Sequence, residues 1–137
     1  MSTYATQSDI EDIFGPTNVA AWSLFETSTP TGPADPTRVA TALAYADAQI
    51  NAFFADGPYA LPLACARNQP VVTRWAATIA GIWLYGSRTT ASYIDYEGNR
   101  YIALQTAVQQ EMDLYKSGVN RLDAPLRFPH PTGPTAT

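Results

Sequence analysis

The chain has little of what catalytic and metal-binding sites are built from. It contains one cysteine and one histidine in 137 residues. A single cysteine excludes an internal disulfide framework and a zinc site made of several cysteines, and it favours synthesis in a reducing cytoplasm. No apolar run reaches the roughly 18–20 residues that a membrane-spanning helix needs. The start of the chain is polar and acidic, unlike a secretory signal, so we expect no membrane partner.

Charged residues are also scarce, at 15% of the chain against about 25% in average soluble proteins. We therefore expect neutral polar side chains, or other protein, to cover much of the surface. Eight Lys and Arg stand against twelve Asp and Glu, which gives a net charge of −4. This balance argues against binding of duplex DNA through its phosphates. The length fits one domain with a hydrophobic core of its own.

The distribution of proline predicts helices joined by loops. Eleven prolines lie in clusters, and the long segments between the clusters contain none, as helices require. Asp35 followed by Pro36 is a typical helix start. The apolar residues after it recur every three or four positions, as one face of a helix does: Val39, Leu43, Ala46, Ile50 and then Phe53 or Phe54.

Two further long helices follow from the same reasoning. Residues 70–85 are apolar nearly all round, which is typical of a central, buried helix. The apolar pattern from Tyr101 to Gly118 predicts a closing helix, and we place its start between residues 92 and 99. The composition of residues 89–99 leaves a short hairpin open as an alternative there.

The two ends of the chain complete the prediction. Residues 6–14 and 16–25 predict short helices, with Thr6 or Ser8 as the cap of the first and Gly15 ending it. Residues 119–137, rich in proline and threonine, predict an extended or disordered tail. The expected fold is all-α: three main helices plus one or two short N-terminal ones. We expect residues 1–118 to form the helical domain and residues 119–137 an extended C-terminal arm.

A search for chemistry finds no catalytic set. His130 lies between two prolines of the tail, where nothing fixes an imidazole in one orientation. Cys65 lies in an apolar loop and is interpreted as a small buried hydrophobe. The acidic residues of 6–14 suit the positive end of a helix and need no metal to explain them. We expect no enzymatic activity, no cofactor and no metal.

Charge differs between the two halves of the chain. Residues 1–64 carry seven acidic side chains and one basic one, whereas residues 65–137 carry five acidic and seven basic ones. Pairing of the two halves within one molecule explains this, and so does packing of unlike surfaces between neighbouring molecules, as in a ring. In the second interpretation Arg74 and Arg88 contact a neighbour.

Five stretches of the sequence, in order, form a recognisable pattern over about residues 4–118: Tyr4-Ala5-Thr6-Gln7 with Asp9-Ile10 and Phe14-Gly15; Val39, Ala42-Leu43, Ala46 and Ile50; Tyr59-Ala60-Leu61-Pro62-Leu63; Pro70, Val71, Ala76, Ile79-Ala80, Leu84-Tyr85 and Arg88; and Tyr101, Leu104 and Gly118. Together they resemble the Mu-like head–tail connector family of phage proteins, which is similar in fold to adaptor or head-completion proteins. Residues 27–34 and the tail depart from the family pattern.

The resemblance implies a structural adaptor in the neck of a tailed phage. Such a protein forms a ring of identical subunits beneath the portal protein, joins head to tail and continues the DNA channel, through which DNA passes without specific binding. Its other partner is the next neck or tail-completion protein, and its location is the virion. The alternative is a small helical binding module or assembly chaperone that acts as a monomer or dimer.

Two segments are the main interface candidates. The loop of residues 59–65 is more apolar than an exposed loop usually is, so we expect Tyr59, Leu61, Pro62 and Leu63 to contact a neighbouring subunit or the portal, with packing on the chain's own core as the alternative. In the arm, Leu126, Arg127 and Phe128 are expected to dock on another protein, since extended proline-containing backbone loses little entropy on binding.

Overall fold

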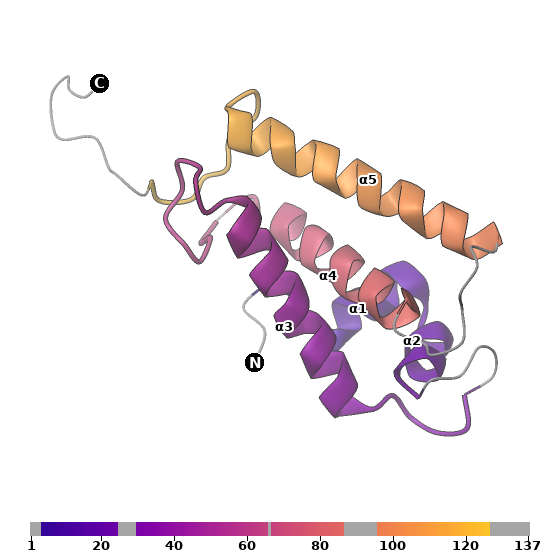
Figure 1. Cartoon of the computed structure of the whole chain (residues 1–137). Helices are drawn as coiled ribbons and strands as arrows, with labels where there is room; N and C mark the ends of the chain where they lie inside the picture. Colours follow the sequence, from indigo (N-terminus) through magenta and orange to yellow (C-terminus); the bar gives the residue numbers. More distant parts are fainter. Residues whose placement is uncertain (1–3, 25–29, 66, 87–95, 127–137) are drawn as a thin grey trace, which may run out of the picture.

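Figure 1 shows the fold, a computed structural model that describes residues 4–24, 30–65, 67–86 and 96–126. In this part of the chain five helices occur and no strand beyond one isolated bridge. The helices are α1 (Gln7–Phe14), α2 (Pro16–Ser23), α3 (Pro36–Phe53), α4 (Gln69–Gly86) and α5 (Tyr96–Ser117). The all-α prediction of three main helices and two short N-terminal ones is confirmed.

Residues next to the helix ends determine where α1 begins and ends and where α2 begins. Thr6 caps α1: its side chain accepts a hydrogen bond from the backbone of Asp9, and the Asp9 carboxylate accepts one from the backbone N–H of Thr6 at 2.8 Å. This reciprocal pair satisfies two N–H groups that a helix start leaves open. Gly15 ends α1 with a φ of 93°, a conformation that glycine adopts at little cost, and Pro16 opens α2 at once.

Helix α2 is two residues shorter than the sequence predicted. It ends at Ser23 and not at residue 25. The Ser23 hydroxyl donates to the Ala20 carbonyl at 2.9 Å and accepts from the backbone N–H of Asp35, also at 2.9 Å. A serine that bonds nearby backbone competes with continuation of the helix. The same contact fixes the residue that caps α3.

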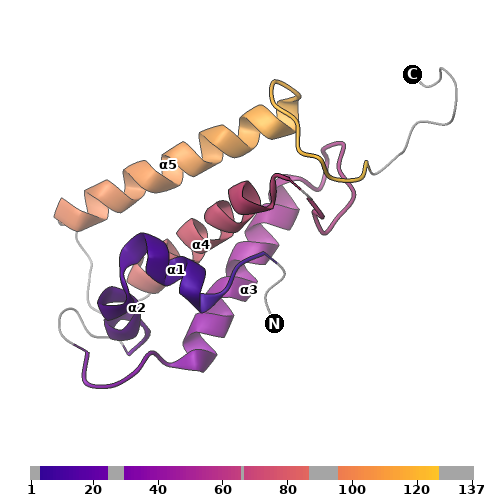
Figure 2. The same cartoon turned by 180° about the vertical axis from the view of Figure 1, so that it is seen from behind.

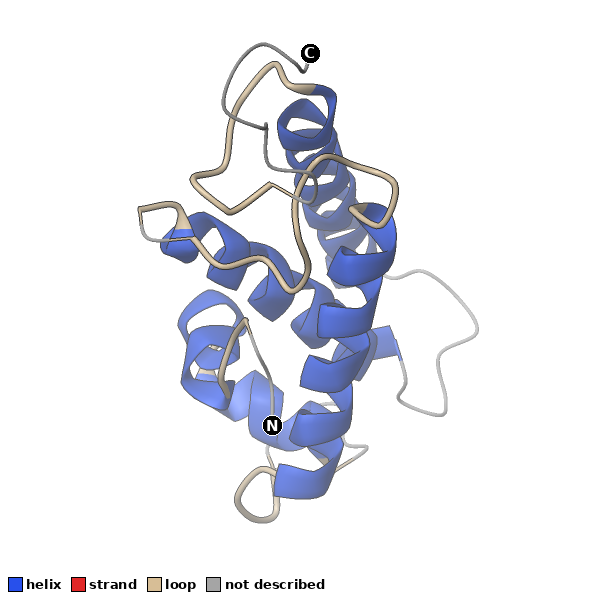
Figure 3. Ribbon diagram, turned by 90° about the vertical axis from the view of Figure 1, so that its left-hand side faces the viewer, coloured by secondary structure: helices blue, strands red, loops and turns tan. Residues whose placement is uncertain are grey.

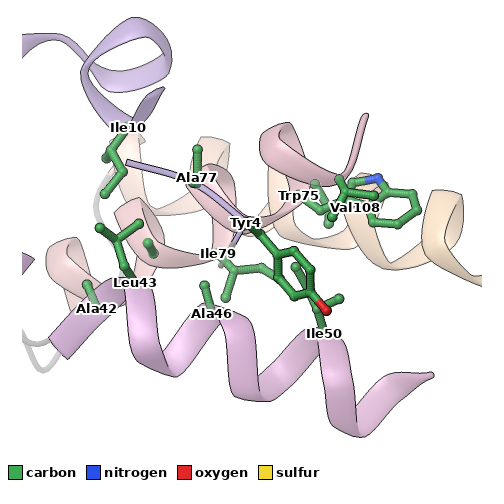
Figure 4. Packing of buried hydrophobic residues seen from close by; sticks show 14 of the residues in the cluster. Tyr4, Ile10, Ala42, Leu43, Ala46, Ile50, Trp75, Ala77, Ile79 and Val108 are labelled. Carbon is green, nitrogen blue, oxygen red and sulfur yellow. The ribbon is translucent and has the colours of Figure 1, made fainter. Parts of the chain in front are cut away.

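Helix α4 is the centre of the fold, in contact with each of the other four helices. Figure 1 shows α4 behind and between α3 and α5, and Figure 2, from behind, shows α1 in front of α4. The expected stripe of α3 is buried against it at Val39, Leu43, Ala46 and Ile50. Figure 4 shows Leu43, Ala46 and Ile50 of this stripe on the side of α3 that faces Ile79 of α4. Contact with all four other helices buries most of the side chains of α4, which explains its largely apolar sequence.

Two groups of aromatic rings pack between α4 and its neighbouring helices. Tyr101 of α5 lies 5.3 Å from the Phe14 ring, 5.6 Å from Trp22 and 4.8 Å from Tyr85, each edge to face. At the other end Trp75 is fully buried, stacked on Phe54 at 5.8 Å. Edge-to-face and offset contacts of this kind are favourable beyond the area they bury. Trp22 and Trp75 are thus core residues.

Two of the described loops meet at one end of the molecule. Figure 3 looks onto that end, where the connection from α3 to α4 meets the segment after α5. Gly118 ends α5 with a φ of 94°, and the chain then turns back toward residues 59–60. Leu122 is 4% exposed and belongs to the core. The described start of the arm therefore packs on the helical domain.

Candidate interface

The loop of residues 59–65 packs mainly on this chain. Tyr59 and Leu63 are each 3% exposed and lie in the core, whereas Leu61 is half-buried against it. Pro62 alone among the expected contact residues of the loop is exposed. For Tyr59 and Leu63 the structure shows the alternative that the sequence left open, which is packing on the chain's own core. Only Leu61 and Pro62 remain on the surface for another protein.

Tyr59 holds the loop to the segment after α5. Its hydroxyl donates to the carbonyl of Tyr115 at 3.2 Å and accepts from the backbone N–H of Leu122 at 3.0 Å. The backbone N–H of Ala60 donates to the carbonyl of Pro125 at 2.8 Å, beside an antiparallel bridge between Tyr59 and Leu126. We call these two paired segments, residues 58–65 and 118–126, the clasp.

Asp123 closes the other side of the clasp. Its carboxylate accepts hydrogen bonds from the backbone N–H groups of Arg67 and Asn68, and its own N–H donates to the Asn68 side chain at 3.0 Å. The same carboxylate adds to burial in raising the pKa of Cys65 to about 11. A thiol with so high a pKa stays protonated near neutrality and is a poor nucleophile, which agrees with the interpretation of Cys65 as a small hydrophobe.

The N-terminal end of the described chain reaches the same loop. The hydroxyl of Tyr4 accepts from the backbone N–H of Leu63 at 2.8 Å and donates to the Asn51 side chain at 2.5 Å. Burial is the main cause that raises the pKa of Tyr4 above its ordinary value. Tyr4 and Tyr59, both part of the resemblance, thus have a structural explanation: each phenol bonds backbone that lies far away in the sequence.

Replacing Tyr59 with phenylalanine is expected to lower the free energy of unfolding by about 1–3 kcal/mol, since the buried N–H of Leu122 would lose its partner. Tyr45 is 39% exposed, so Tyr45→Phe is the matched control and should change stability little. Urea denaturation followed by circular dichroism measures both. Equal stability of the two variants would show that the Tyr59 hydroxyl does not fasten the clasp.

The arm is described only at its beginning. Leu126 is half-buried against the core, which places it with the clasp. Arg127 and Phe128 lie outside the described residues, as does Arg88. Of the expected contact residues in the second half, Arg74 is described, and its guanidinium pairs with Glu111 of the same chain. Glu111 also accepts from the Trp75 ring N–H at 2.8 Å.

In the described part of the chain, an ion pair joins the two charged halves within the molecule. Lys116 of α5 pairs with Asp56 at 2.7 Å, as the intramolecular interpretation expects. The Arg74–Glu111 pair joins two residues of the second half and supports neither interpretation. Both pairs include a side chain that is more than half exposed, so each contributes little to stability.

A groove that the sequence did not reveal runs between α3 and α5. It has a volume of about 270 Å³ and no charged side chain in its lining. We call it the α3–α5 groove; its lining residues are Tyr45, Gln49, Ala52, Phe53, Ile79, Gln105, Gln109 and Met112. Next to the groove, the centre of the Trp83 ring lies 6.0 Å from that of the Tyr45 ring. The Arg38 guanidinium lies over the Trp83 ring, 5.2 Å from its centre. Figure 1 looks onto this face.

The described residues include no group of three or more side chains that could hold a metal ion. Within the same ranges of the chain, no helix is long and apolar enough to cross a membrane.

Comparison with known proteins gives one match. No curated protein sequence matches the chain. The family model described as "Bacteriophage Mu, Gp36" matches residues 4–125. This range includes all five helices and nearly all of the clasp, so the whole described domain is what the family shares. The chain belongs to the bacteriophage Mu Gp36 family.

Proposed function

We propose that the protein is a structural adaptor in the neck of a tailed phage. It forms a ring of identical subunits beneath the portal, joins head to tail and continues the DNA channel. The observation that carries the proposal is the family match over residues 4–125, which assigns the domain to a phage family. In this role the protein works without catalysis, a cofactor or a metal.

The proposed partners are the portal protein, identical neighbours and the next neck or tail-completion protein. DNA passes through the ring without specific contacts. The surface of α1 and α2 supports this, because residues 4–24 contain Asp9, Glu11 and Asp12 and no lysine or arginine. Such a surface lacks the cations that bind phosphate. Pro62 and Leu61, at the surface of the clasp, are the described loop residues that we propose to contact a neighbour or the portal.

Mixing the purified protein with the portal of the same phage tests the proposal. We expect electron microscopy to show a ring seated on the portal, with as many adaptor subunits as the portal symmetry allows. The portal of an unrelated phage is the control and should stay bare. If the folded protein fails to bind its own portal, the adaptor proposal is wrong, and the binding module or assembly chaperone takes its place.

A further inference from the structure

The side chains that line the α3–α5 groove limit the kinds of molecule that can bind in it. Its lining is uncharged and combines three glutamine amides with Tyr45 and Phe53 over a floor of Ile79 and Met112. A polyphosphate backbone needs cations, and none lines the groove. A volume of about 270 Å³ lies below the roughly 300–1,000 Å³ typical of small-molecule sites. The groove is therefore better suited to a few side chains of a peptide than to a nucleic acid or a small molecule.

Aromatic rings next to amide donors favour a proline-rich peptide. Proline rings pack on exposed aromatic surfaces in grooves of this kind. Prolines lack an N–H, so such a peptide offers mainly carbonyl oxygens, and a glutamine amide donates hydrogen bonds to them. Tyr45, which is 39% exposed and lines the groove, supplies the aromatic surface. Gln49 and Gln109, both exposed, supply the donors from opposite walls.

The chain contains a segment with this chemistry outside the described residues. Residues 128–137 include three prolines and one phenylalanine and no Asp, Glu, Lys or Arg. In polyproline geometry the residues from 127 to 137 reach about 34 Å, which exceeds the length of about 27 Å of an 18-residue helix such as α3. Residues 128–137, the uncharged part of this segment, match an uncharged groove between two long helices.

The direction of the described chain favours the groove of a second copy. In Figures 1 and 2 the yellow end of the described chain runs outward past the loop of residues 59–65. It leaves the molecule at its edge, on the side away from the middle of α3 and α5. To enter its own groove, the chain would have to reverse direction after Leu126.

We propose that residues 127–137 of one copy bind in the α3–α5 groove of the next copy. The proposal rests on the proposed ring, because it supplies one contact between neighbouring subunits. The donor end and the receiving groove are different surfaces of the same molecule, so the contact runs head to tail and can close into a ring. Phe128 contacts the apolar floor at Ile79 and Met112, and the proline rings pack on Tyr45.

Photo-crosslinking of the full chain tests this contact without the portal. One preparation carries p-benzoylphenylalanine in place of Phe128, and the other is labelled with heavy isotopes and carries no probe. After mixing and irradiation, mass spectrometry is expected to find probe crosslinks to residues 45–53 or 105–112 of the heavy copy. Crosslinks confined to the light chain, crosslinks elsewhere on the heavy chain, or no crosslinks would each overturn the proposal.

A pair of neighbouring glutamines supplies the matched control. Gln109→Glu removes a donor from the groove and adds a negative charge there, so the yield of crosslinks between copies should fall severalfold. Gln110→Glu adds the same charge next to it, at an exposed residue outside the groove lining, and should leave the yield unchanged. An equal response of both variants would show that the groove is not the site. The portal is absent from this experiment, so a negative crosslinking result does not contradict binding to the portal. A negative result in the portal experiment likewise does not contradict the contact between copies.

Discussion

Gly81→Ala is expected to lower the free energy of unfolding by about 1–3 kcal/mol, the usual cost of an overpacked core. A Cβ atom on Gly81, in α4, would overlap the Phe14 ring of α1. That ring cannot move aside easily, because Trp22 holds it at 5.6 Å and Tyr101 at 5.3 Å. Glycine to alanine within a helix otherwise stabilises by about 1 kcal/mol, so the sign of the effect is itself diagnostic.

Gly86→Ala is the matched control for this prediction. Gly86 is the last residue of α4, and a Cβ there meets nothing within 4 Å. We expect its stability to equal or slightly exceed that of the original chain. Urea unfolding of both variants, followed by far-ultraviolet circular dichroism, gives the comparison. If Gly81→Ala is as stable as Gly86→Ala, then α1 does not pack closely on α4 at this point.

Truncation after residue 118 is expected to destabilise the domain by about 3–5 kcal/mol, a large share of the roughly 5–15 kcal/mol that holds a domain folded. The cut removes Leu122, which is 4% exposed, and loss of a buried leucine side chain alone costs about 2–5 kcal/mol. It also uncovers Tyr59, whose hydroxyl bonds the backbone of Leu122, and removes the carboxylate of Asp123 from the backbone of Asn68. Residues 119–126 thus contribute to the domain and not only to an arm.

Truncation after residue 126 provides the comparison. It keeps the clasp and removes only residues outside the described ranges, so the melting temperature should stay within a few degrees of that of the full chain. The two truncations separate folding from assembly, because the shorter deletion should affect only contacts between molecules. A chain ending at residue 118 that melted at the same temperature as the full chain would contradict the packing of Leu122.

Much of the fold was predictable because its signals are local. Asp35 and Pro36 stand next to each other at the start of α3, and the stripe that begins at Val39 lies within that one helix. The loop of residues 59–65 was different. Its apolar content indicated burial, but the residues that cover Tyr59 lie 56 and 63 positions further along the chain. Composition cannot tell a core contact from an interface contact at such a separation.

The α3–α5 groove was missed for the same reason. Tyr45 and Gln49 lie off the apolar stripe of α3 and look like ordinary exposed residues. Gln105 and Gln109 look equally ordinary on α5, about sixty positions away. The four side chains line one groove only because α3 and α5 both pack on α4. The signal that the sequence does contain is compositional: neutral amides stand where an exposed helix face more often carries charges.

The clasp also determines when the molecule can finish folding during synthesis. The loop of residues 59–65 bonds Tyr4 through Leu63 and Pro125 through Ala60, so it joins the earliest and the latest described parts of the chain. While the ribosome is still adding residues 119–125, Tyr59 and Leu122 cannot meet, and the apolar loop lacks its cover. The nascent protein therefore exposes this surface until residues 119–125 have emerged, and the surface is then covered in one step.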